Sequence, residues 1–197
     1  MEQANGNPPR ETQPLPDRVL LHACCAPCSI ACVDDLRESG VEPTAFWYNP
    51  NIHPFTEYRQ RRNTLREYAA SIGMALAERD EYGLRAFLQE VDGAFDARCP
   101  VCYRMRLDAA AAYAAEHGFP AFSTTLLISP YQNHALLIEA GERAASRYGV
   151  PFLYRDLRPR FREGQDRARD LGLYMQKYCG CIFSEEDRYR KRKKKQA

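Results

Sequence analysis

The sequence predicts an α/β fold in which a parallel sheet is covered by helices on both faces. Short apolar segments alternate with longer amphipathic segments between residues 18 and 154, and this alternation is typical of βαβ units. The chain has 197 residues, of which 45% are hydrophobic, so it can bury one core and a single domain is expected.

The first half of the chain contains three predicted strands. Apolar runs place them at residues 18–24, 43–48 and 74–79. Helices are predicted at residues 29–38, at 56–72, which is a long polar segment, and around residues 84–91. Gly40 and Gly73 follow the first two helices, where glycine commonly ends a helix. Thr56 is the expected N-cap of the second helix because its hydroxyl could accept a hydrogen bond from an unpaired backbone N–H of the first turn.

The second half continues the alternation. An alanine-rich helix is expected from Cys99 to His117, followed by a buried strand at residues 121–126. Another helix is expected at residues 134–148, and residues 150–154 read as a final strand. The predicted order therefore remains strand, helix, strand.

The two ends of the chain differ in composition from its centre. Residues 1–17 hold four of the 13 prolines and almost no apolar side chain, so we expect a flexible leader. Residues 188–197 form a basic tail with seven of the 28 basic residues. The remaining 21 basic and 26 acidic residues give residues 1–187 a net charge of −5. Such a tail could bind a polyanion or could simply be a solvated arm.

The sequence contains neither a predicted membrane-spanning helix nor a predicted signal peptide. No run approaches the roughly 18 uncharged apolar residues of a membrane-spanning helix, and the leader lacks the apolar centre of a signal peptide. We therefore expect a cytoplasmic protein with residues 18–187 as its one catalytic domain.

Eight cysteines carry the strongest chemical signal. Seven of them fall into three groups: Cys24, Cys25 and Cys28; Cys99 and Cys102; Cys179 and Cys181. Clustered cysteines in a chain without a secretory signal indicate metal binding or redox chemistry. In parallel sheets ligands bind beyond the carboxyl ends of the strands, which is where Cys24 lies. Cys32, four residues after Cys28, reads as a small buried side chain.

Three kinds of site remain open from the cysteines alone. An iron-sulfur centre suits thiolates drawn from a chain with its own core. A structural zinc site would need only two of the pairs. A thioredoxin-like thiol-disulfide oxidoreductase is the third reading, because Cys25-Ala-Pro-Cys28 follows a strand and opens a helix. The zinc reading would make the chain a zinc-stabilised RNA-binding module.

Five motifs give the chain a resemblance to a known family. They are LLHACCAPC from Leu20, YNPNI from Tyr48, RCPVCYRMR from Arg98, TTL from Thr124 and YCGC from Tyr178. In this order they closely resemble the QueH-type epoxyqueuosine reductases, over about residues 18–184. The leader and the tail lie outside the resemblance.

The resemblance implies a Rossmann-like, HUP-like fold related to adenine-nucleotide hydrolases. It implies a cobalamin-independent reductase that converts epoxyqueuosine in a tRNA anticodon to queuosine, the last step of queuosine biosynthesis. The implied partners are the tRNA and an electron donor that the sequence does not identify.

The resemblance also implies roles for the cysteines. Cys24, Cys25, Cys99 and Cys102 match the ligands of a 4Fe-4S cluster, and Cys179 and Cys181 match a redox-active pair that can form a disulfide bond. A second metal ion, iron or zinc, is implied beside the cluster. Cys28 is a candidate ligand of that ion, although some family members carry aspartate at its position.

Several further residues are candidates for substrate contact. Trp47 and Tyr48 could stack on an exposed base or could belong to the core. His134 lies on the expected rim of the site, where it could equally make local helix contacts. Two arginine groups could bind phosphates or be neutralised by neighbouring carboxylates: Arg59, Arg61, Arg62 and Arg66; Arg155, Arg158, Arg160 and Arg162.

Overall fold

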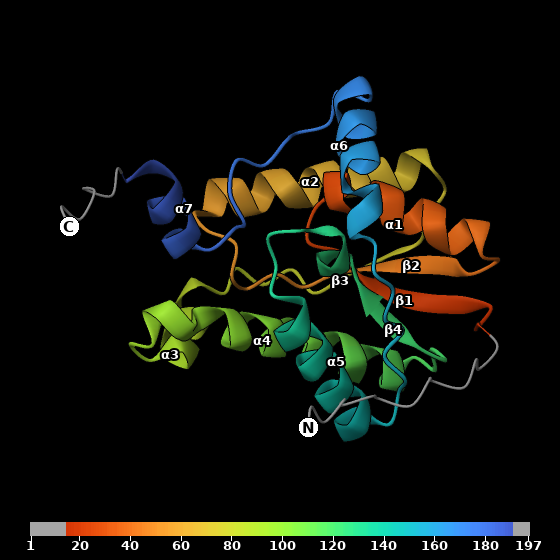
Figure 1. Cartoon of the computed structure of the whole chain (residues 1–197), viewed down its shortest axis with the longest axis horizontal. Coiled ribbons are helices and arrows are strands. Elements are labelled where there is room, and N and C mark those ends of the chain that lie inside the picture. The colour runs from red at the N-terminus through yellow and green to blue at the C-terminus, as the bar shows by residue number, and fades with distance from the viewer. Residues whose placement is uncertain (1–14, 191–197) are drawn as a thin grey trace, which may run out of the picture.

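The computed structural model describes residues 15–190, and its centre is a four-stranded parallel sheet in the order β3-β2-β1-β4 (Figure 1). The strands are β1 (Arg18–His22), β2 (Glu42–Trp47), β3 (Leu76–Glu78) and β4 (Phe122–Thr124). Strand β1 pairs with β2 on one side and with β4 on the other. The strands that follow β1 in sequence are added first on one side of it (β2, β3) and then on the other (β4). The carboxyl end of β1 is therefore the topological switch point of the sheet.

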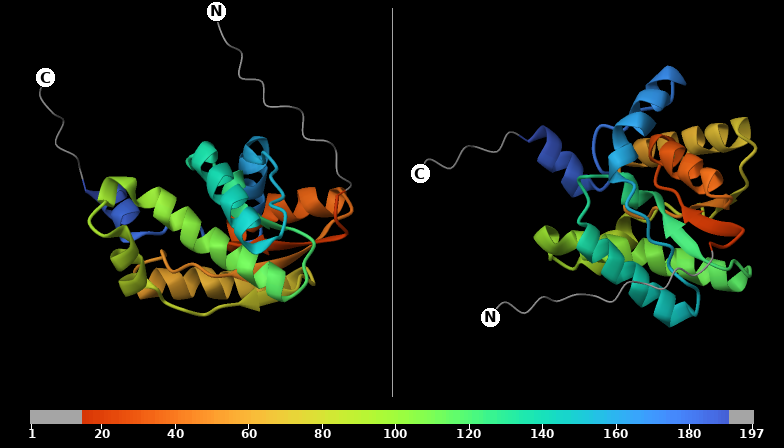
Figure 2. Two further views of the ribbon diagram at one scale, coloured as in Figure 1. Left: turned by 90° about the horizontal axis from the view of Figure 1, so that it is seen from below. Right: turned by 45° about the vertical axis from the view of Figure 1, so that its right-hand side comes forward.

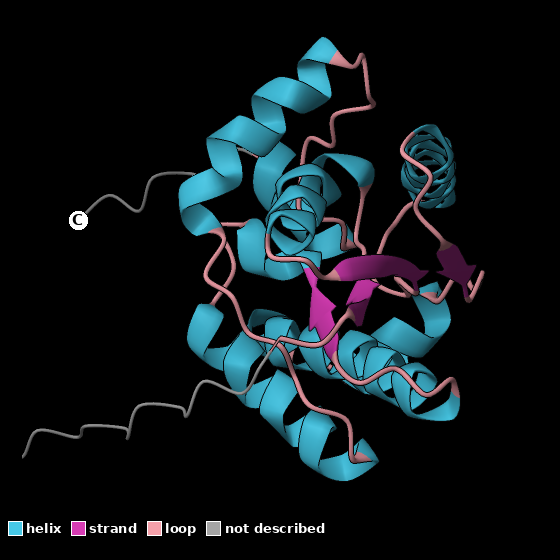
Figure 3. Ribbon diagram, turned by 90° about the vertical axis from the view of Figure 1, so that its right-hand side faces the viewer, coloured by secondary structure: helices cyan, strands magenta, loops and turns pink. Residues whose placement is uncertain are grey.

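Helices cover both faces of this sheet, as the sequence predicts. They are α1 (Ala26–Glu38), α2 (Phe55–Ser71), α3 (Leu84–Val91), α4 (Arg98–Glu116), α5 (His134–Tyr148), α6 (Phe161–Asp170) and α7 (Ile182–Tyr189). Helix α1 packs with α2 and α6 on one face, while α4 packs with α5 beneath β1 and β4 (Figure 3). The predicted α/β class is confirmed.

Helix α7 lies at the end of the sheet where the strands point. Figure 2 shows α7 beside α3 and the start of α4. Phe183 of α7 contacts Phe87 of α3, and Cys181 shares a small apolar cluster with Phe87 and Cys102 of α4. The C-terminal part of the described chain therefore returns to the carboxyl ends of the strands. No helix among residues 15–190 is both long and apolar enough to span a membrane.

Helix α1 begins three residues earlier than the sequence suggests. The prediction treats Ala26 and Pro27 as an interruption, but both belong to the first helical turn. Proline is tolerated there because the first backbone N–H groups of a helix have no acceptor within the helix. The Cys25 side chain caps this turn by accepting a hydrogen bond from the backbone N–H of Cys28.

Two further local predictions are wrong. Helix α2 starts at Phe55 after Pro54, so Thr56 is not its N-cap and no side chain caps it. The expected final strand reduces to one bridge between Phe122 and Phe152. Pro151 precedes that bridge without an N–H to donate, so a longer ladder cannot form there.

Strand β4 and the C-terminal helices also depart from the expectations. Strand β4 ends at Thr124 and continues as a 3-10 helix, η2 (Thr125–Ile128), whose first turn is capped by the Thr124 hydroxyl. Two shorter 3-10 helices are η1 (Phe95–Ala97) and η3 (Arg158–Arg160). Helices α6 and α7 had no predicted counterpart. The leader and most of the basic tail lie outside the described residues.

The core follows from the position of β1 between two strands. Val19, Leu20 and Leu21 are each at most 1% exposed, because helices cover both faces of this central strand. A strand buried on both faces reads as a continuous apolar run rather than an alternating one, which is why β1 was recognisable. The core holds the carboxyl end of β1 rigidly against β2 and β4.

Candidate metal centre and active site

Three cysteine sulfurs meet where β1 ends and α1 begins. The Sγ atoms of Cys24, Cys25 and Cys28 all lie within 4.8 Å of one another, and all three residues are buried. The sulfurs of Cys24 and Cys25 are 3.7 Å apart. We call these three residues the cysteine triad. A buried group of three soft sulfur donors is suited to a thiolate-binding metal or cluster.

The local fold explains why these three sulfurs converge. Cys24 and Cys25 occupy the turn after β1, and Cys28 lies in the first turn of α1. The backbone N–H of Cys28 donates to the sulfur of Cys25 at 3.4 Å. The N-terminal end of a helix carries positive partial charge, which favours the thiolate form of a cysteine placed there.

Hydrogen bonds within the triad separate the pKa values of its members. The bond from Cys25 holds the pKa of Cys24 well below its usual value. Burial raises the pKa of Cys25, and the bonds with Cys24 and Cys25 raise the pKa of Cys28. Cys24 is therefore the member of the triad that loses its proton most readily. Metal binding would release the remaining protons.

Residues from two distant segments close over the triad. The hydroxyl of Thr125, at the start of η2, donates to the sulfur of Cys24 at 3.3 Å. The side-chain N–H of Gln176 contacts the sulfurs of Cys25 and Cys28 at 3.1 and 3.4 Å. Hydrogen bonds to metal-bound sulfurs are a means by which proteins tune such centres.

The second pair of cysteines starts helix α4. Cys99 is exposed and Cys102 is buried. The group of cysteine sulfurs that lie within 4.8 Å of one another includes neither Cys99 nor Cys102. Burial raises the pKa of Cys102 to about 12.

Arg106 lies one helical turn beyond Cys102 and is fully buried. Its guanidinium donates to the sulfur of Cys102 at 3.0 Å and to the carbonyl of Cys102 at 3.2 Å. The same charge helps lower the pKa of Cys24. A buried positive charge that acts on both Cys102 and Cys24 offsets the cost of holding several thiolates away from water.

The third pair lies on the segment that leads into α7. Cys179 is exposed and accepts a hydrogen bond from the Gln132 amide at 3.3 Å. Cys181 is buried and caps α7 by accepting from the backbone N–H of Ser184. All eight cysteines are free thiols in this structure.

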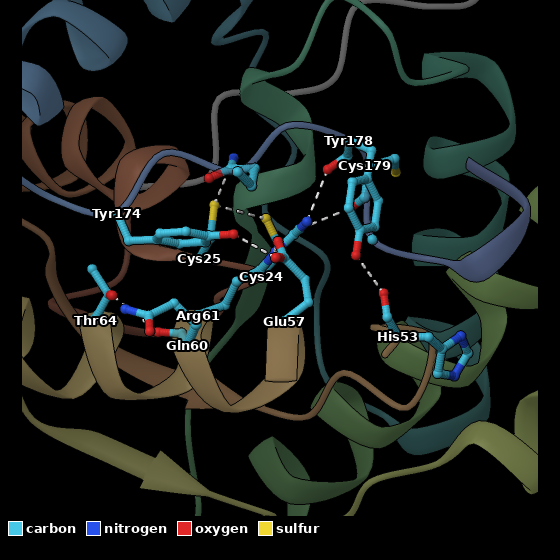
Figure 4. Close-up of polar contacts among 12 residues, drawn as sticks. Cys24, Cys25, His53, Glu57, Gln60, Arg61, Thr64, Tyr174, Tyr178 and Cys179 are labelled. Atoms are coloured by element: carbon cyan, nitrogen blue, oxygen red, sulfur yellow. Dashed lines mark hydrogen bonds and ion pairs between the residues drawn. The ribbon is translucent and has the colours of Figure 1, made fainter. Parts of the chain in front are cut away.

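Arg61 holds the Cys179 segment in place. Its guanidinium donates to the backbone carbonyls of Cys179 and Tyr178 at 3.0 and 2.9 Å and to the Glu57 carboxylate at 2.7 Å (Figure 4). The hydroxyl of Tyr174 reaches the other oxygen of Glu57 at 2.5 Å. Burial by itself would lower the pKa of Arg61, but its electrostatic interactions with Cys25 and Glu57 keep this pKa raised.

Replacing Arg61 with methionine should therefore be strongly destabilising. The change leaves Glu57 buried without its counter-charge, so we expect the free energy of unfolding to fall by about 3–5 kcal/mol. Arg66→Met is the matched control on the same helix, because the Arg66–Glu78 pair is partly exposed and should contribute about 0–1 kcal/mol. Denaturant unfolding measures both. Equal losses in the two variants would show that the buried pair has no special role.

Gly180 occupies a position that disfavours any residue with a side chain. Its φ of +139° lies in a region that side chains disfavour, and an added Cβ would lie 3.2 Å from Ile52 and 3.3 Å from Arg61. The glycine between Cys179 and Cys181 thus lets the backbone pass close to the Arg61 guanidinium.

Gly180→Ala should displace the two flanking cysteines and lower the free energy of unfolding by about 1–3 kcal/mol. Gly172→Ala is the control, because Gly172 also has a positive φ but has open space around it. We expect both variants to melt earlier and only Gly180→Ala to lose substrate turnover. Full turnover in Gly180→Ala would contradict a positional requirement for this segment.

A cavity of about 400 Å³ opens above the triad. Cys24 and Cys28 form part of its lining, together with Cys179. Its other walls come from the η2–α5 connection, the start of α6 and the segment before α7. The cavity is within the size range of sites that bind small molecules, and thiols from two sequence motifs face it.

The chain is similar over most of its length to one known protein family. The family model described as "Epoxyqueuosine reductase QueH" matches residues 19–187. The chain belongs to the QueH family. The epoxyqueuosine reductase QueH of Dehalococcoides mccartyi is 40% identical over 174 residues, covering 88% of this chain and 96% of the relative. That of Thermotoga maritima is 34% identical and covers 88% and 93%.

One solved structure supports the fold alone. It is described as a predicted subunit of a tRNA methyltransferase from Methanocaldococcus jannaschii, with a TM-score of 0.50 and 10% identity. The likeness covers 75% of this chain and 74% of that protein. At 10% identity this likeness shows only that the two proteins share an α/β fold, and it carries no information about activity.

The structure assigns other roles to the aromatic candidates of this QueH chain. Trp47 is fully buried and donates to the Tyr58 hydroxyl at 3.1 Å. Tyr48 is 9% exposed and lies under the Arg79 guanidinium. Both residues belong to the core, so base stacking by Trp47 or Tyr48 is contradicted. His134 bonds locally to the carbonyl of Ser129 at 3.3 Å.

Most of the candidate phosphate-binding arginines are compensated by carboxylates. Those with an acidic partner are Arg61, Arg62, Arg66, Arg155, Arg158 and Arg160. The pairs other than that of Arg61 are at least partly exposed and match the alternative that the sequence left open, a solvated face of mixed charge. The Arg61 pair is buried. Cys32 is fully buried and bonds to the carbonyl of Cys28, as expected of a small core side chain.

Sequence reasoning missed several residues that surround the thiols. Gln176 and Gln132 lie in irregular segments, where no periodicity marks a buried or site-facing side chain. Arg106 was detectable, because a residue four positions after Cys102 on a helix lies on the same face. A positive charge at that spacing from a cysteine is a usable signal.

Proposed function

We propose that this QueH protein reduces the epoxide of epoxyqueuosine in tRNA to the alkene of queuosine, the last step of queuosine biosynthesis. The observation that carries the proposal is the buried cysteine triad at the wall of an open cavity in a chain of this family. A tRNA-modifying reductase acts where tRNA is, so we infer a cytoplasmic protein.

The reaction has a simple balance. The epoxide takes up two electrons and two protons, both C–O bonds break, a C=C bond remains and the oxygen leaves as water. The electrons come from a donor that must dock at the protein surface.

The residues around the triad fit a metal centre. Buried thiols, hydrogen-bond donors on the sulfurs and the two buried arginines Arg61 and Arg106 together suit an anionic thiolate cluster. We assign Cys24, Cys25, Cys99 and Cys102 as ligands of a 4Fe-4S cluster, and Cys28 as a ligand of a second metal ion, iron or zinc. Such a cluster, when bound, would supply electrons singly.

Cys179 and Cys181 are assigned as a redox-active pair. Cys179 lines the cavity and Arg61 fixes its backbone beside the triad. A dithiol that closes to a disulfide releases two electrons and two protons, which is the amount that the epoxide consumes. This balance supports a pair that stores reducing equivalents for the substrate.

The test is an anaerobic preparation analysed for iron, sulfide and zinc, followed by incubation with epoxyqueuosine tRNA and a reductant such as dithionite. We expect a brown protein that contains sulfide and forms queuosine. A colourless protein with only a titratable disulfide would favour a thiol-disulfide oxidoreductase. Stoichiometric zinc without sulfide or turnover would favour a zinc-stabilised RNA-binding module.

A further inference from the structure

Tyr131 is the most exposed large hydrophobic side chain among the described residues. It is 84% exposed, whereas the next, Leu171, is 56% exposed. A single exposed apolar residue is ordinary on a protein surface, so exposure alone implies nothing. The Tyr131 ring is notable because it also lines the cavity that contains the cysteine sulfurs.

The Tyr131 ring is held at one wall of the thiol-lined cavity. It lies in the connection between η2 and α5, where the backbone N–H of Tyr131 donates to the Ser129 hydroxyl at 3.3 Å. Its ring meets the ring of Phe161, at the start of α6, edge to face with centroids 5.9 Å apart. Both rings line the same cavity as Cys24 and Cys28.

This arrangement leaves one face of an aromatic ring available next to the reactive groups. Phe161 contacts Tyr131 in a T-shaped arrangement, and the Tyr131 side chain is otherwise largely exposed to solvent. The cavity volume of about 400 Å³ suits one extruded base rather than a base-paired segment. Unpaired bases are commonly bound by stacking on tyrosine or phenylalanine.

Cationic side chains border the same cavity. Lys177 and Arg188 line it, and neither forms an ion pair within the part of the chain that the structure describes. Most arginines of the two groups considered above are neutralised. An uncompensated charge beside an exposed aromatic ring matches the combination that proteins use for single-stranded RNA, where cations track the backbone and rings stack on bases.

We propose that Tyr131, supported by Phe161, is a stacking platform for an unpaired nucleobase of the tRNA anticodon loop at the mouth of the cavity. The inference rests on the proposed function and names the contact through which the loop is held above the cysteines. Enzymes that act on a base must take it out of the stack, and the platform replaces the stacking that the base loses.

The test compares three variants in anaerobic binding to a labelled anticodon stem-loop RNA. Tyr131→Leu keeps an apolar side chain but removes the ring, so its dissociation constant should rise about 5- to 150-fold, the range for loss of one stacked base. Tyr131→Phe keeps the ring and should bind within about twofold of the unchanged protein. Tyr189→Leu is the control, since Tyr189 is exposed but does not line the cavity.

Three readouts separate the possible outcomes. Iron content and thermal unfolding of Tyr131→Leu should match the unchanged protein, because the side chain is exposed. The loss of affinity should appear with the stem-loop and be absent with a fully paired RNA duplex. Stem-loop affinity unchanged in Tyr131→Leu, or an equal loss with the duplex, would overturn the platform.

The platform and the proposed function fail in different ways. If the unchanged protein binds the stem-loop through Tyr131 but never forms queuosine, the reductase assignment fails and the stacking contact stands. If Tyr131→Leu forms queuosine with an unchanged KM, the platform fails and the reductase assignment stands.

Discussion

Cys99→Ser and Cys102→Ser should each lose most of their iron and sulfide when the protein is made without oxygen. Thiolates are the ligands of iron-sulfur clusters, and a serine hydroxyl is a poor replacement for one of them. Iron and sulfide analysis, together with the visible absorbance of the cluster, measures the loss. Turnover of epoxyqueuosine tRNA should fall in parallel.

The charge distribution around Cys102 supports this expectation. Without metal, burial keeps Cys102 protonated, since its pKa is raised to about 12. The Arg106 guanidinium, 3.0 Å from its sulfur, would stabilise the thiolate once a metal displaces the proton. A fully buried arginine aimed at a buried thiol is costly unless that thiol carries negative charge in the working protein.

A graded set of cysteine variants completes the experiment. Cys24→Ser should lose the cluster like the α4 variants, whereas Cys28→Ser should keep the cluster iron and lose only the second metal ion. Cys32→Ala is the matched control, because Cys32 is equally buried next to the triad but does not belong to it. Full cluster content in both Cys99→Ser and Cys102→Ser would restrict the metal centre to the triad.

The sequence predicted the part of the site that local structure determines. Cys24 follows a recognisable buried strand, and Cys28 lies one helical turn from Cys25, so their proximity follows from strand and helix geometry alone. The start of α1 was misjudged because Pro27 reads as a helix breaker unless it is recognised in the first turn. This error displaced a helix boundary but not the cysteines.

The rest of the site depends on tertiary packing that spacing does not reveal. Whether α4 brings Cys99 and Cys102 to the triad depends on how α4 packs under β1 and β4. Arg61 contacts the carbonyl of Cys179 across 118 positions of sequence. Gln176 and Tyr131 lie in irregular segments. There, neither the two-residue repeat of a strand nor the 3.6-residue repeat of a helix indicates which way a side chain points.

The Cys179 segment combines two environments within three residues. Cys179 is exposed at the cavity, while Cys181 is buried beside Phe87 and caps α7. A disulfide across a single residue is strained, and strained disulfides are more readily reduced. This strain is consistent with the proposal that the pair alternates between dithiol and disulfide during turnover.

Cys179→Ser and Cys181→Ser should retain a full 4Fe-4S absorbance and yet fail to convert epoxyqueuosine tRNA over repeated cycles. Neither side chain belongs to the assigned ligand set, so iron and sulfide stay bound, but the pair can no longer supply two electrons and two protons. Anaerobic assays of queuosine formed per protein, with Cys32→Ala as the control, measure the difference. Loss of the cluster in either variant would make the pair metal ligands, and normal repeated turnover in both would make it structural.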